Sequence, residues 1–254
     1  MTARAPSPSA DPAVVWHDVE CGGYGGDLAL WEELASRRSG PLLELGAGTG
    51  RVALHLARRG HRIVAVERDP ALAAELARRA AAELLEVEVI AGDVRELALE
   101  RRFGLILAPM QFLQLFLDAD ERSSLLAACR AHLSPGGLLA AAMIDGVPDA
   151  VLPPEPGDSA PLPDLRELDG VVYSSLPLGV TVRAGVMESR RRRERVTRDG
   201  EIDVAPHVDR LALLDASRVG AEAGAVGLRV ERRVELAASE AHVGSTVLIL
   251  GADQ

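Results

Sequence analysis

The chain has 254 residues, of which 48% are apolar, and its formal net charge is -10 at pH 7. This length suits one large domain, or one domain with an insertion, and the apolar share is enough for a sizeable core. The negative charge excludes nucleic acid as the default partner, because such a molecule repels a phosphate backbone. No run approaches the ~18 apolar residues of a membrane helix, so we expect no membrane association.

The use of cysteine and of basic residues narrows the chemistry further. Cys21 and Cys129 lie far apart without CxxC spacing, which disfavours a zinc knuckle or a disulfide framework and favours a cytoplasmic location. All 28 basic residues are Arg, and the sequence contains neither Lys nor Asn. This excludes a Walker-type GK[ST] loop, a Schiff-base lysine and a Tyr/Lys proton relay. The histidines show no metal-ligand spacing, so we expect no metal.

The first half of the chain alternates short apolar runs with helical patterns. We expect a disordered tail at 1–15, a strand at 42–45, and then a glycine turn into a helix that ends near Gly60. Asp69 is the expected N-cap of a second helix, with Pro70 at its first position. Further strands are predicted at 61–67, 87–93 and 103–109, a helix at 118–133, and a turn into a fifth strand at 134–145.

This alternation predicts an α/β fold, a Rossmann-like, doubly wound and mostly parallel sheet that binds ligands at the carboxyl ends of its strands. We place its core at residues 16–145. Residues 146–213 differ, because a Pro-rich and acidic stretch, long enough for a flap, precedes β-rich runs with an Asp199-Gly200 hairpin signal. They predict an antiparallel β insertion after strand five, on the substrate side. Residues 214–254 supply a closing helix at about 215–224 and the last two strands.

Three glycines stand between the first strand and its helix, in LLELGAGTGRVALHLARRG at 42–60. Gly46, Gly48 and Gly50 can take positive φ and have no Cβ, so a ligand can lie on the main chain at the positive end of the helix. A GxG turn alone is a weak signal, which a tight turn without a ligand also explains. Nicotinamide and flavin folds use GxGxxG, whereas position 51 is Arg, so a nicotinamide oxidoreductase is disfavoured.

With Glu44 before the turn, ELGAGTG resembles motif I of the class I S-adenosylmethionine-dependent methyltransferases. The resemblance continues through Glu67 at the end of the second strand, AGD at 91–93 and SPGG at 134–137. It covers residues from about 24 to 145 well and the closing helix and strands more loosely. It implies a seven-stranded sheet of order 3-2-1-4-5-7-6, S-adenosyl-L-methionine as cofactor and S-adenosyl-L-homocysteine as product.

The resemblance also assigns roles to residues. Glu44 suits a cofactor that carries an ammonium and a sulfonium, and Glu67 matches the acid that accepts hydrogen bonds from both ribose hydroxyls. Asp93 matches the residue near the adenine amino group, and Tyr24 an aromatic that closes over the methionine part. Each of these residues also has a plain alternative as a turn, surface or packing residue. The expected cofactor-binding set is Tyr24, Glu44, Gly46, Ala47, Gly48, Gly50, Glu67, Arg68, Asp93, Val94, Ala108 and Met110.

The acceptor is expected beyond the fourth strand, in APMQFLQLF at 108–116. Met110 and Gln111 are predicted to line the substrate site, and Gln114 fits either that site or the core. An amine acceptor needs only a neutral lone pair, whereas a hydroxyl or carbon acceptor needs a general base, so N, O and C all stay open. His207, Asp145 and Tyr24 are the candidates for catalysis. The absence of NPPY or DPPY disfavours methylation of nucleic-acid bases or protein glutamine.

The run RRRRER at 190–195 is the one feature that suggests RNA. The negative total charge and the small number of aromatic residues oppose that interpretation, and we favour a solvated or subunit-facing ribbon. The prediction is therefore a small-molecule methyltransferase, monomeric or homodimeric. The alternatives are an RNA methyltransferase that uses the arginine hairpin and a catalytically silent S-adenosylmethionine-binding protein.

Overall fold

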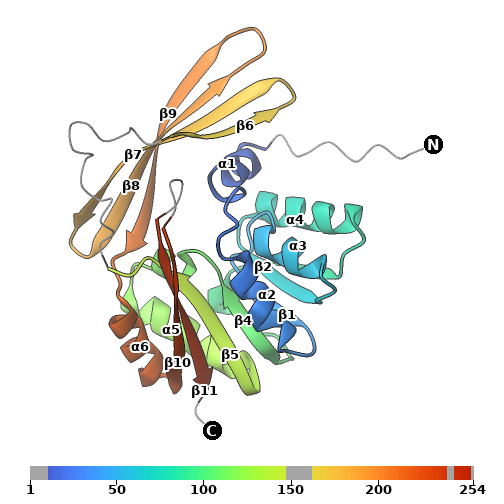
Figure 1. Cartoon of the computed structure of the whole chain (residues 1–254), viewed down its shortest axis with the longest axis vertical. Helices are drawn as coiled ribbons and strands as arrows, with labels where there is room; N and C mark the ends of the chain where they lie inside the picture. The colour runs from blue at the N-terminus through green and yellow to red at the C-terminus, as the bar shows by residue number, and fades with distance from the viewer. Residues whose placement is uncertain (1–10, 147–161, 239–242, 253–254) are drawn as a thin grey trace.

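The computed structural model describes residues 11–146, 162–238 and 243–252, which form two sheets. The seven-stranded core sheet has the order β10-β11-β5-β4-β1-β2-β3, and a separate four-stranded sheet has the order β6-β7-β8-β9 (Figure 1). Because β10 and β11 are the sixth and seventh strands of the core, this is the order 3-2-1-4-5-7-6. The predicted fold class is confirmed.

The predicted core elements are present, with ends that differ by up to three residues. The core strands are β1 Leu42–Leu45, β2 Ile63–Glu67, β3 Val87–Ala91, β4 Phe103–Ala108, β5 Leu133–Met143, β10 Leu228–Leu236 and β11 Ser245–Ala252. The α-helices are α1 Pro12–Cys21, α2 Leu28–Ser36, α3 Arg51–Ala57, α4 Pro70–Ala82, α5 Ala119–His132 and α6 Ala216–Ala225, and η1 Val94–Glu96 and η2 Phe112–Leu115 are 3-10 helices. Within the described ranges, no helix has the length and apolar character to cross a membrane.

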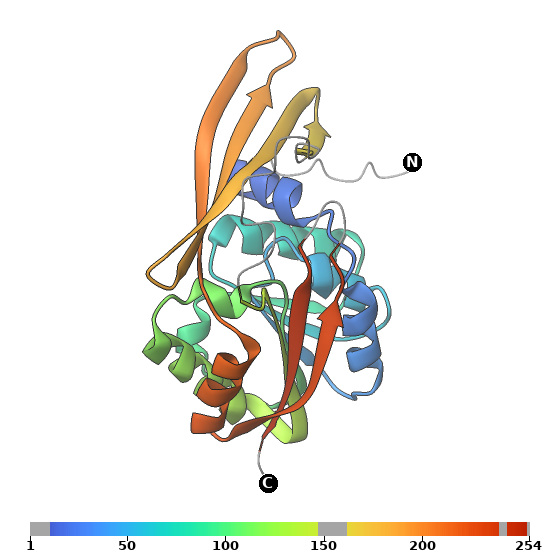
Figure 2. The same ribbon diagram turned by 60° about the vertical axis from the view of Figure 1, so that its left-hand side comes forward.

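Helices cover both faces of the core sheet (Figure 2). On one face, apolar side chains of β1, β2, β4 and β5 pack against α5 and α6, and on the other they pack against α2, α3 and α4. Strand β1 shows the alternation that this requires, with Leu43 and Leu45 on the first face and Leu42 on the second. Glu44 has the same parity as Leu42, so it points toward the layer of α2 and α3. This places an acid inside an apolar layer.

The second sheet, which we call the cap sheet, consists of β6 Asp164–Leu168, β7 Val171–Arg183, β8 Val186–Val196 and β9 Ile202–Ala212. All its pairings are antiparallel, and it lies within the predicted insertion at 146–213. The Asp199-Gly200 hairpin is confirmed: Gly200 has φ +85°, and the Thr197 amide donates to the carbonyl of Glu201 at 2.9 Å. Most of the predicted flap, residues 147–161, lies outside the described residues.

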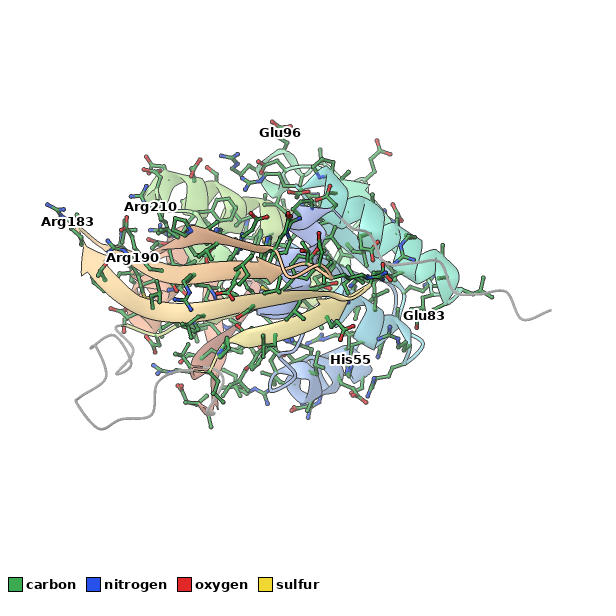
Figure 3. The ribbon with its side chains drawn as sticks, turned by 90° about the horizontal axis from the view of Figure 1, so that it is seen from above. His55, Glu83, Glu96, Arg183, Arg190 and Arg210 are labelled. Atoms are coloured by element: carbon green, nitrogen blue, oxygen red, sulfur yellow. The ribbon has the colours of Figure 1, made fainter. Side chains whose placement is uncertain are left out.

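The arginine run of β8 divides between the two faces of the cap sheet. Arg191 and Arg193 face helix α1, where both form ion pairs with Glu20. Arg190 and Arg192 point to the other face and are exposed. Figure 3 shows Arg190 with Arg183 and Arg210 toward one end of this sheet, the end of the β7–β8 hairpin. The two-residue period of a strand thus divides the basic run into one row that contacts α1 and one exposed row, whose Arg190 and Arg192 pair with glutamates of the same strand.

Helix α1 differs from the sequence prediction, which placed residues 1–15 in a disordered tail. The helix begins at Pro12, and the carboxylate of Asp11 caps it by accepting from the Ala13 amide at 2.9 Å. It lies between the core and the cap sheet (Figure 1), and Trp16 packs edge-on against Tyr173 with ring centroids 5.4 Å apart. The guanidinium of Arg193 stacks over the Trp16 ring. Helix α1 is therefore the main contact between the two sheets on this side.

Gln114 joins the core to the cap sheet on the other side. Its side chain is fully buried, and its amide nitrogen donates to the carbonyls of Ile144 and Ala212 at 3.1 and 3.0 Å. Its amide oxygen accepts from the Ile144 amide at 2.8 Å. One side chain thus holds the chain where it leaves β5 and where it returns from β9.

We expect Gln114→Leu to lower the free energy of unfolding by roughly 2–5 kcal/mol, because the main-chain groups of Ile144 and Ala212 lose their buried partner. Urea denaturation followed by circular dichroism measures this change. Gln111→Leu, the same substitution at a half-buried neighbour, is the control and should cost less than about 1 kcal/mol. Equal losses in the two variants would contradict the role assigned to Gln114.

Candidate active site

The three glycines form the turn between β1 and α3, at the carboxyl end of the parallel strands. Gly46, Gly48 and Gly50 have φ of +63°, +56° and +96°, so all three have the left-handed backbone for which glycine is preferred. Gly50 is also the N-cap residue of α3. The predicted turn is confirmed in its backbone conformation, and it places main-chain amides at the start of a helix.

Side chains from distant parts of the chain pack directly on this turn. A Cβ on Gly46 would overlap the Phe112 ring, and a Cβ on Gly48 would overlap the imidazole of His17. The absence of side chains at these glycines is therefore needed for close approach as well as for φ. Phe112 belongs to the segment after β4, so the turn and the expected acceptor region are in contact.

Glu67, at the end of β2, fixes the middle of the turn. Its Oε2 accepts from the Gly48 amide and its Oε1 from the Asp69 amide, both at 2.8 Å. The side chain is 9% exposed. A carboxylate has about four acceptor positions, and these two bonds leave others for a ligand. The ribose contact stays a prediction, and the structure adds a second task, which is to hold the turn at the end of β2.

Glu44, the acid before the turn, is 2% exposed, and its Oε2 has no hydrogen-bond partner among the described residues. Burial raises the pKa of this carboxyl group to about 8, against the opposing attraction of Arg51. An unpartnered buried oxygen of this kind is uncommon in proteins and costs free energy. Glu44 therefore provides unused acceptor capacity beside the glycine turn.

Tyr24 lies in the segment before α2, next to the first turn of α3. Arg51 donates to the Tyr24 carbonyl at 3.0 Å and to both oxygens of Asp27 at 2.5 and 2.7 Å. The guanidinium of Arg51 also stacks over the Tyr24 ring, 5.1 Å from its centroid. Since Asp27 is buried, this ion pair fixes the Tyr24 segment against the glycine turn. A contact of the other ring face with a sulfonium stays a prediction.

The expected adenine side lies at the end of β3. Asp93 caps η1, and hydrogen bonds from Arg95 to its carboxylate lower its pKa to about 2. Val94 is buried, and Arg68 is exposed beside Glu67. The structure thus gives Asp93 a structural partner in Arg95, while its contact with a purine ring stays a prediction.

The segment after β4 supplies the expected substrate residues. Ala108 ends β4 and is fully buried, whereas Met110 and Gln111 are half-buried. Met110 has φ +55°, a strained conformation for a residue with a side chain, and such strain clusters at functional sites. Gln114 lies in the same segment, but both hydrogens of its amide are used on main-chain carbonyls.

The two other catalytic candidates, Asp145 and His207, are both held by partners. Asp145 accepts from the Ala216 amide at 2.8 Å and pairs with Arg233 at 2.7 Å, so it connects the end of β5 to α6 and β10. The Nε2 atom of His207 lies 3.0 Å from a carboxylate oxygen of Asp209. His207 is the cross-strand partner of Arg191, so it faces the same side of the cap sheet as the residues that contact α1.

Sequence reasoning missed helix α1 and its contacts with the glycine turn. Asp18 of α1 is buried, accepts from the Thr49 hydroxyl at 2.7 Å and pairs with Arg79 of α4. Hydrogen bonds from Arg79 and Thr49 outweigh burial and keep the pKa of Asp18 below its usual range. The signal was present, because Asp11-Pro12 repeats the Asp69-Pro70 start of α4. The contacts themselves depend on tertiary packing.

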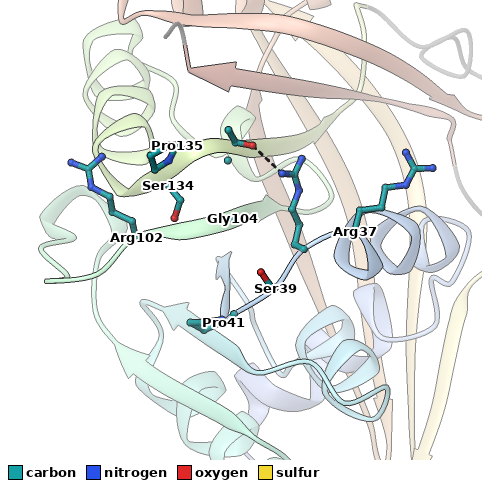
Figure 4. Close-up of a pocket in the computed structure, with 11 residues that line it drawn as sticks. Arg37, Ser39, Pro41, Arg102, Gly104, Ser134 and Pro135 are labelled. Carbon is teal, nitrogen blue, oxygen red and sulfur yellow. Dashed lines mark hydrogen bonds between the residues drawn. The ribbon is translucent and has the colours of Figure 1, made fainter.

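Outside the glycine turn, the described residues offer a cavity but no metal centre. In the described part of the chain, no group of three or more histidine, cysteine or acidic residues is placed to hold a metal ion. A cavity of about 310 Å³ lies at the opposite, amino-terminal end of β4 and β1, near the turn at Pro135 (Figure 4). Arg37, Arg38 and Arg102 line its rim. Because ligands of doubly wound sheets bind at the carboxyl ends of the strands, the glycine turn is the stronger candidate.

Comparison with known proteins agrees with this location. Residues 42–137 match a family described as a methyltransferase domain. A ribosomal RNA small subunit methyltransferase A of Anaeromyxobacter dehalogenans is 38% identical over 113 residues, which are 41% of this chain and 39% of that protein. The chain spans less than half the length of the curated relatives it matches.

Solved structures resemble nearly the whole chain. The sugar N-methyltransferase KedS8 of Streptoalloteichus is 20% identical with a TM-score of 0.72 and covers 98% of both chains. The amino pentose methyltransferase CalS10 of Micromonospora echinaspora is 22% identical with a TM-score of 0.70, over 92% of this chain and 96% of that one. At these identities the likeness establishes the fold, and it includes the cap sheet.

The buried acid gives a test of this geometry without any ligand. Because the pKa of Glu44 is raised to about 8, the folded chain keeps a proton that the unfolded chain loses above about pH 4.5. The contribution of this group to stability is therefore complete below pH 4.5 and is lost as the pH rises toward 8. We expect Glu44→Gln to melt close to the wild type at pH 5 and at least roughly 5 °C higher at pH 8.

Thermal unfolding at pH 5, 6.5 and 8 measures this difference. Glu83→Gln, which removes an exposed acid paired with Arg58, is the control and should show no gain that grows with pH. A Glu44→Gln difference that does not change with pH would mean that the buried carboxyl group is ionised in the folded chain.

Proposed function

We propose that this chain, whose residues 42–137 match a methyltransferase domain, transfers a methyl group from S-adenosylmethionine to an amine nitrogen of a small molecule. The observation that carries the proposal is the glycine turn with an acid on each side. Glu67 binds the turn and retains free acceptor positions, and Glu44 is buried with one oxygen unpartnered.

These residues fit the cofactor by their charge and shape. S-adenosylmethionine carries an ammonium and a sulfonium and lacks the pyrophosphate of a dinucleotide, so acidic side chains beside the turn suit it. Glu67 is one of them, and a bound cation would favour the ionised form of the buried Glu44 carboxyl group. The left-handed backbone at Gly46 and Gly48 lets the chain turn sharply at the carboxyl end of β1, where the amino-acid part is proposed to lie. Glu67 is at the end of β2, where an acceptor of ribose hydroxyls is needed. Bound S-adenosylmethionine supplies a methyl group on a positively charged sulfur, which an aligned nucleophile removes.

The proposed acceptor class rests on two kinds of support. KedS8 is titled a sugar N-methyltransferase and CalS10 an amino pentose methyltransferase, and both share the cap sheet as well as the core. In this chain, the inner face of the cap sheet carries His207 with Asp209 as its partner. An alkyl amine is largely in its ammonium form near pH 7, so it must lose a proton before its lone pair is free. A histidine held by a carboxylate is suited to receive that proton.

The hydrogen bond between His207 and Asp209 determines which nitrogen of His207 acts as the base. Since the Asp209 carboxylate accepts a hydrogen from Nε2 of His207, the lone pair of the imidazole is at Nδ1. We assign to Nδ1 the removal of the amine proton. Met110 and Gln111 lie in the segment after β4, which contacts the end of β9 through Gln114. Alignment of the two reactants supplies most of the acceleration.

The alternatives differ in what they require of the cap sheet. Residues 164–212 contain nine arginines and nine acidic residues, so the described cap sheet is neutral overall and gives little attraction for RNA. The RNA alternative is included in the tests because the ribosomal RNA methyltransferase is 38% identical over the 113 residues that it shares with the chain. A silent cofactor-binding protein would bind S-adenosylmethionine and transfer nothing. We also propose that the protein is cytoplasmic.

The cofactor assignment is tested by calorimetry. We expect micromolar affinity for S-adenosylmethionine and S-adenosylhomocysteine and no binding of NADH. Glu67→Ala should weaken both by at least about tenfold, because ribose contacts and the hold on Gly48 are lost together. Glu83→Ala, an exposed acid, is the control. An unchanged affinity in Glu67→Ala would remove Glu67 from the site, and no binding by the wild type would remove the proposed function.

The acceptor assignment is tested by turnover. Formation of S-adenosylhomocysteine with a panel of amino sugars and other small amines should exceed that with matched alcohols and with RNA. His207→Gln should lower kcat by roughly 10- to 100-fold near pH 7 and less at pH 9, where the amine is already deprotonated. His61→Gln is the control. Cofactor binding with no turnover of any amine would favour the silent protein, and a loss in His207→Gln that is the same at all pH values would exclude a base.

A further inference from the structure

The proposed function leaves the contact of His17 with the glycine turn without a role. His17 lies on α1, and its ring edge at Nε2 and Cε1 stands where a side chain on Gly48 would be. Helix α1 also packs against α4, the helix that follows Glu67 (Figure 1). The imidazole is therefore adjacent to the main chain on which the cofactor is proposed to lie.

The hydrogen bonds around Thr49 determine which nitrogen of His17 carries the hydrogen. The Thr49 hydroxyl has one hydrogen, and it donates that hydrogen to the Asp18 carboxylate at 2.7 Å, since an ionised carboxylate only accepts. The same hydroxyl oxygen lies 3.2 Å from Nδ1 of His17, so it accepts there. Nδ1 thus carries a hydrogen, and a neutral ring has its lone pair at Nε2.

The surroundings keep this ring neutral. Burial lowers the pKa of His17 below its usual value of 6.5, against the attraction of Asp18 and Glu67. Arg79 and Arg51 act in the same direction as burial. Among the residues that the structure describes, the hydrogen bond at Nδ1 is the only one that the ring makes. Nε2 is therefore an acceptor without a partner, at the glycine turn.

We propose that His17 is a cofactor-binding residue whose Nε2 accepts a hydrogen bond from the ammonium of the amino-acid part of S-adenosylmethionine. The inference rests on the proposed function and adds a residue from α1 to its site. A lone pair favours an N–H donor and repels a carboxylate, and a sulfonium has no hydrogen to donate. The ammonium is thus the one group of the amino-acid part that this atom can bind.

A pair of ligands separates this contact from packing. S-adenosylhomocysteine has the amino-acid part, whereas 5′-methylthioadenosine has the same nucleoside and sulfur without it. We expect His17→Phe, which retains an aromatic ring but no acceptor, to weaken S-adenosylhomocysteine about tenfold and to change 5′-methylthioadenosine by less than twofold. His17→Gln, which retains a carbonyl acceptor, should recover part of the affinity. His55→Gln, on the half-buried outer part of α3, is the control.

Nitrogen NMR of the wild-type protein with labelled histidine supplies a measurement that needs no variant. The free protein should show His17 with hydrogen on Nδ1, and S-adenosylhomocysteine should shift Nε2 toward the value of a hydrogen-bonded acceptor. Hydrogen on Nε2, or equal weakening of both ligands in His17→Phe, would overturn the inference and leave the proposed function standing. If the wild type binds neither ligand, the proposed function fails first and this inference falls with it.

Discussion

The buried carboxylate of Asp18 is the interaction on which the rest of the site depends. It binds the Thr49 hydroxyl of the glycine turn, the guanidinium of Arg79 on α4, and Arg166 of the cap sheet at 2.6 Å. Removing one partner of such a buried group is far more costly than the pair is worth, since a charge is left without compensation. Turn, helix and cap sheet therefore keep their relative positions through one side chain of α1.

Helix α1 extends this connection along its length. Trp16 and Glu20 face the cap sheet, where Glu20 pairs with Arg193 at 2.6 and 2.8 Å and accepts from the Ser175 hydroxyl at 2.7 Å. His17 and Asp18 face the glycine turn. The successive residues of one short helix thus contact the proposed cofactor side and the proposed acceptor side. A cofactor that contacts α1 would therefore contact the same helix that holds the cap sheet, and with it His207, in position.

The glycine turn and the acids beside it could be predicted from the sequence because local rules determine them. Positive φ requires glycine at Gly46 and Gly48, and strand ends place Glu44 and Glu67 beside the turn. The rest of the site depends on pairing register and packing. The face on which His207 lies follows from its pairing with Arg191 across two long strands, and no local signal gives that register. The start of α1 could be predicted from Asp11-Pro12. The partners of this helix on α4 and β6 could not be predicted, because they depend on tertiary packing.

Gln114 holds both ends of the cap insertion at one place on the core. The strands that enter and leave the sheet end at the same place, where one amide holds Ile144 and Ala212 and the Gly146 amide donates to the Leu214 carbonyl at 2.8 Å. The chain thus leaves the core and returns to it at one place, beside the end of β5. A change in the outer strands of the cap sheet therefore leaves the register of the core strands unaltered, provided that the contacts of Gln114 and of α1 are retained.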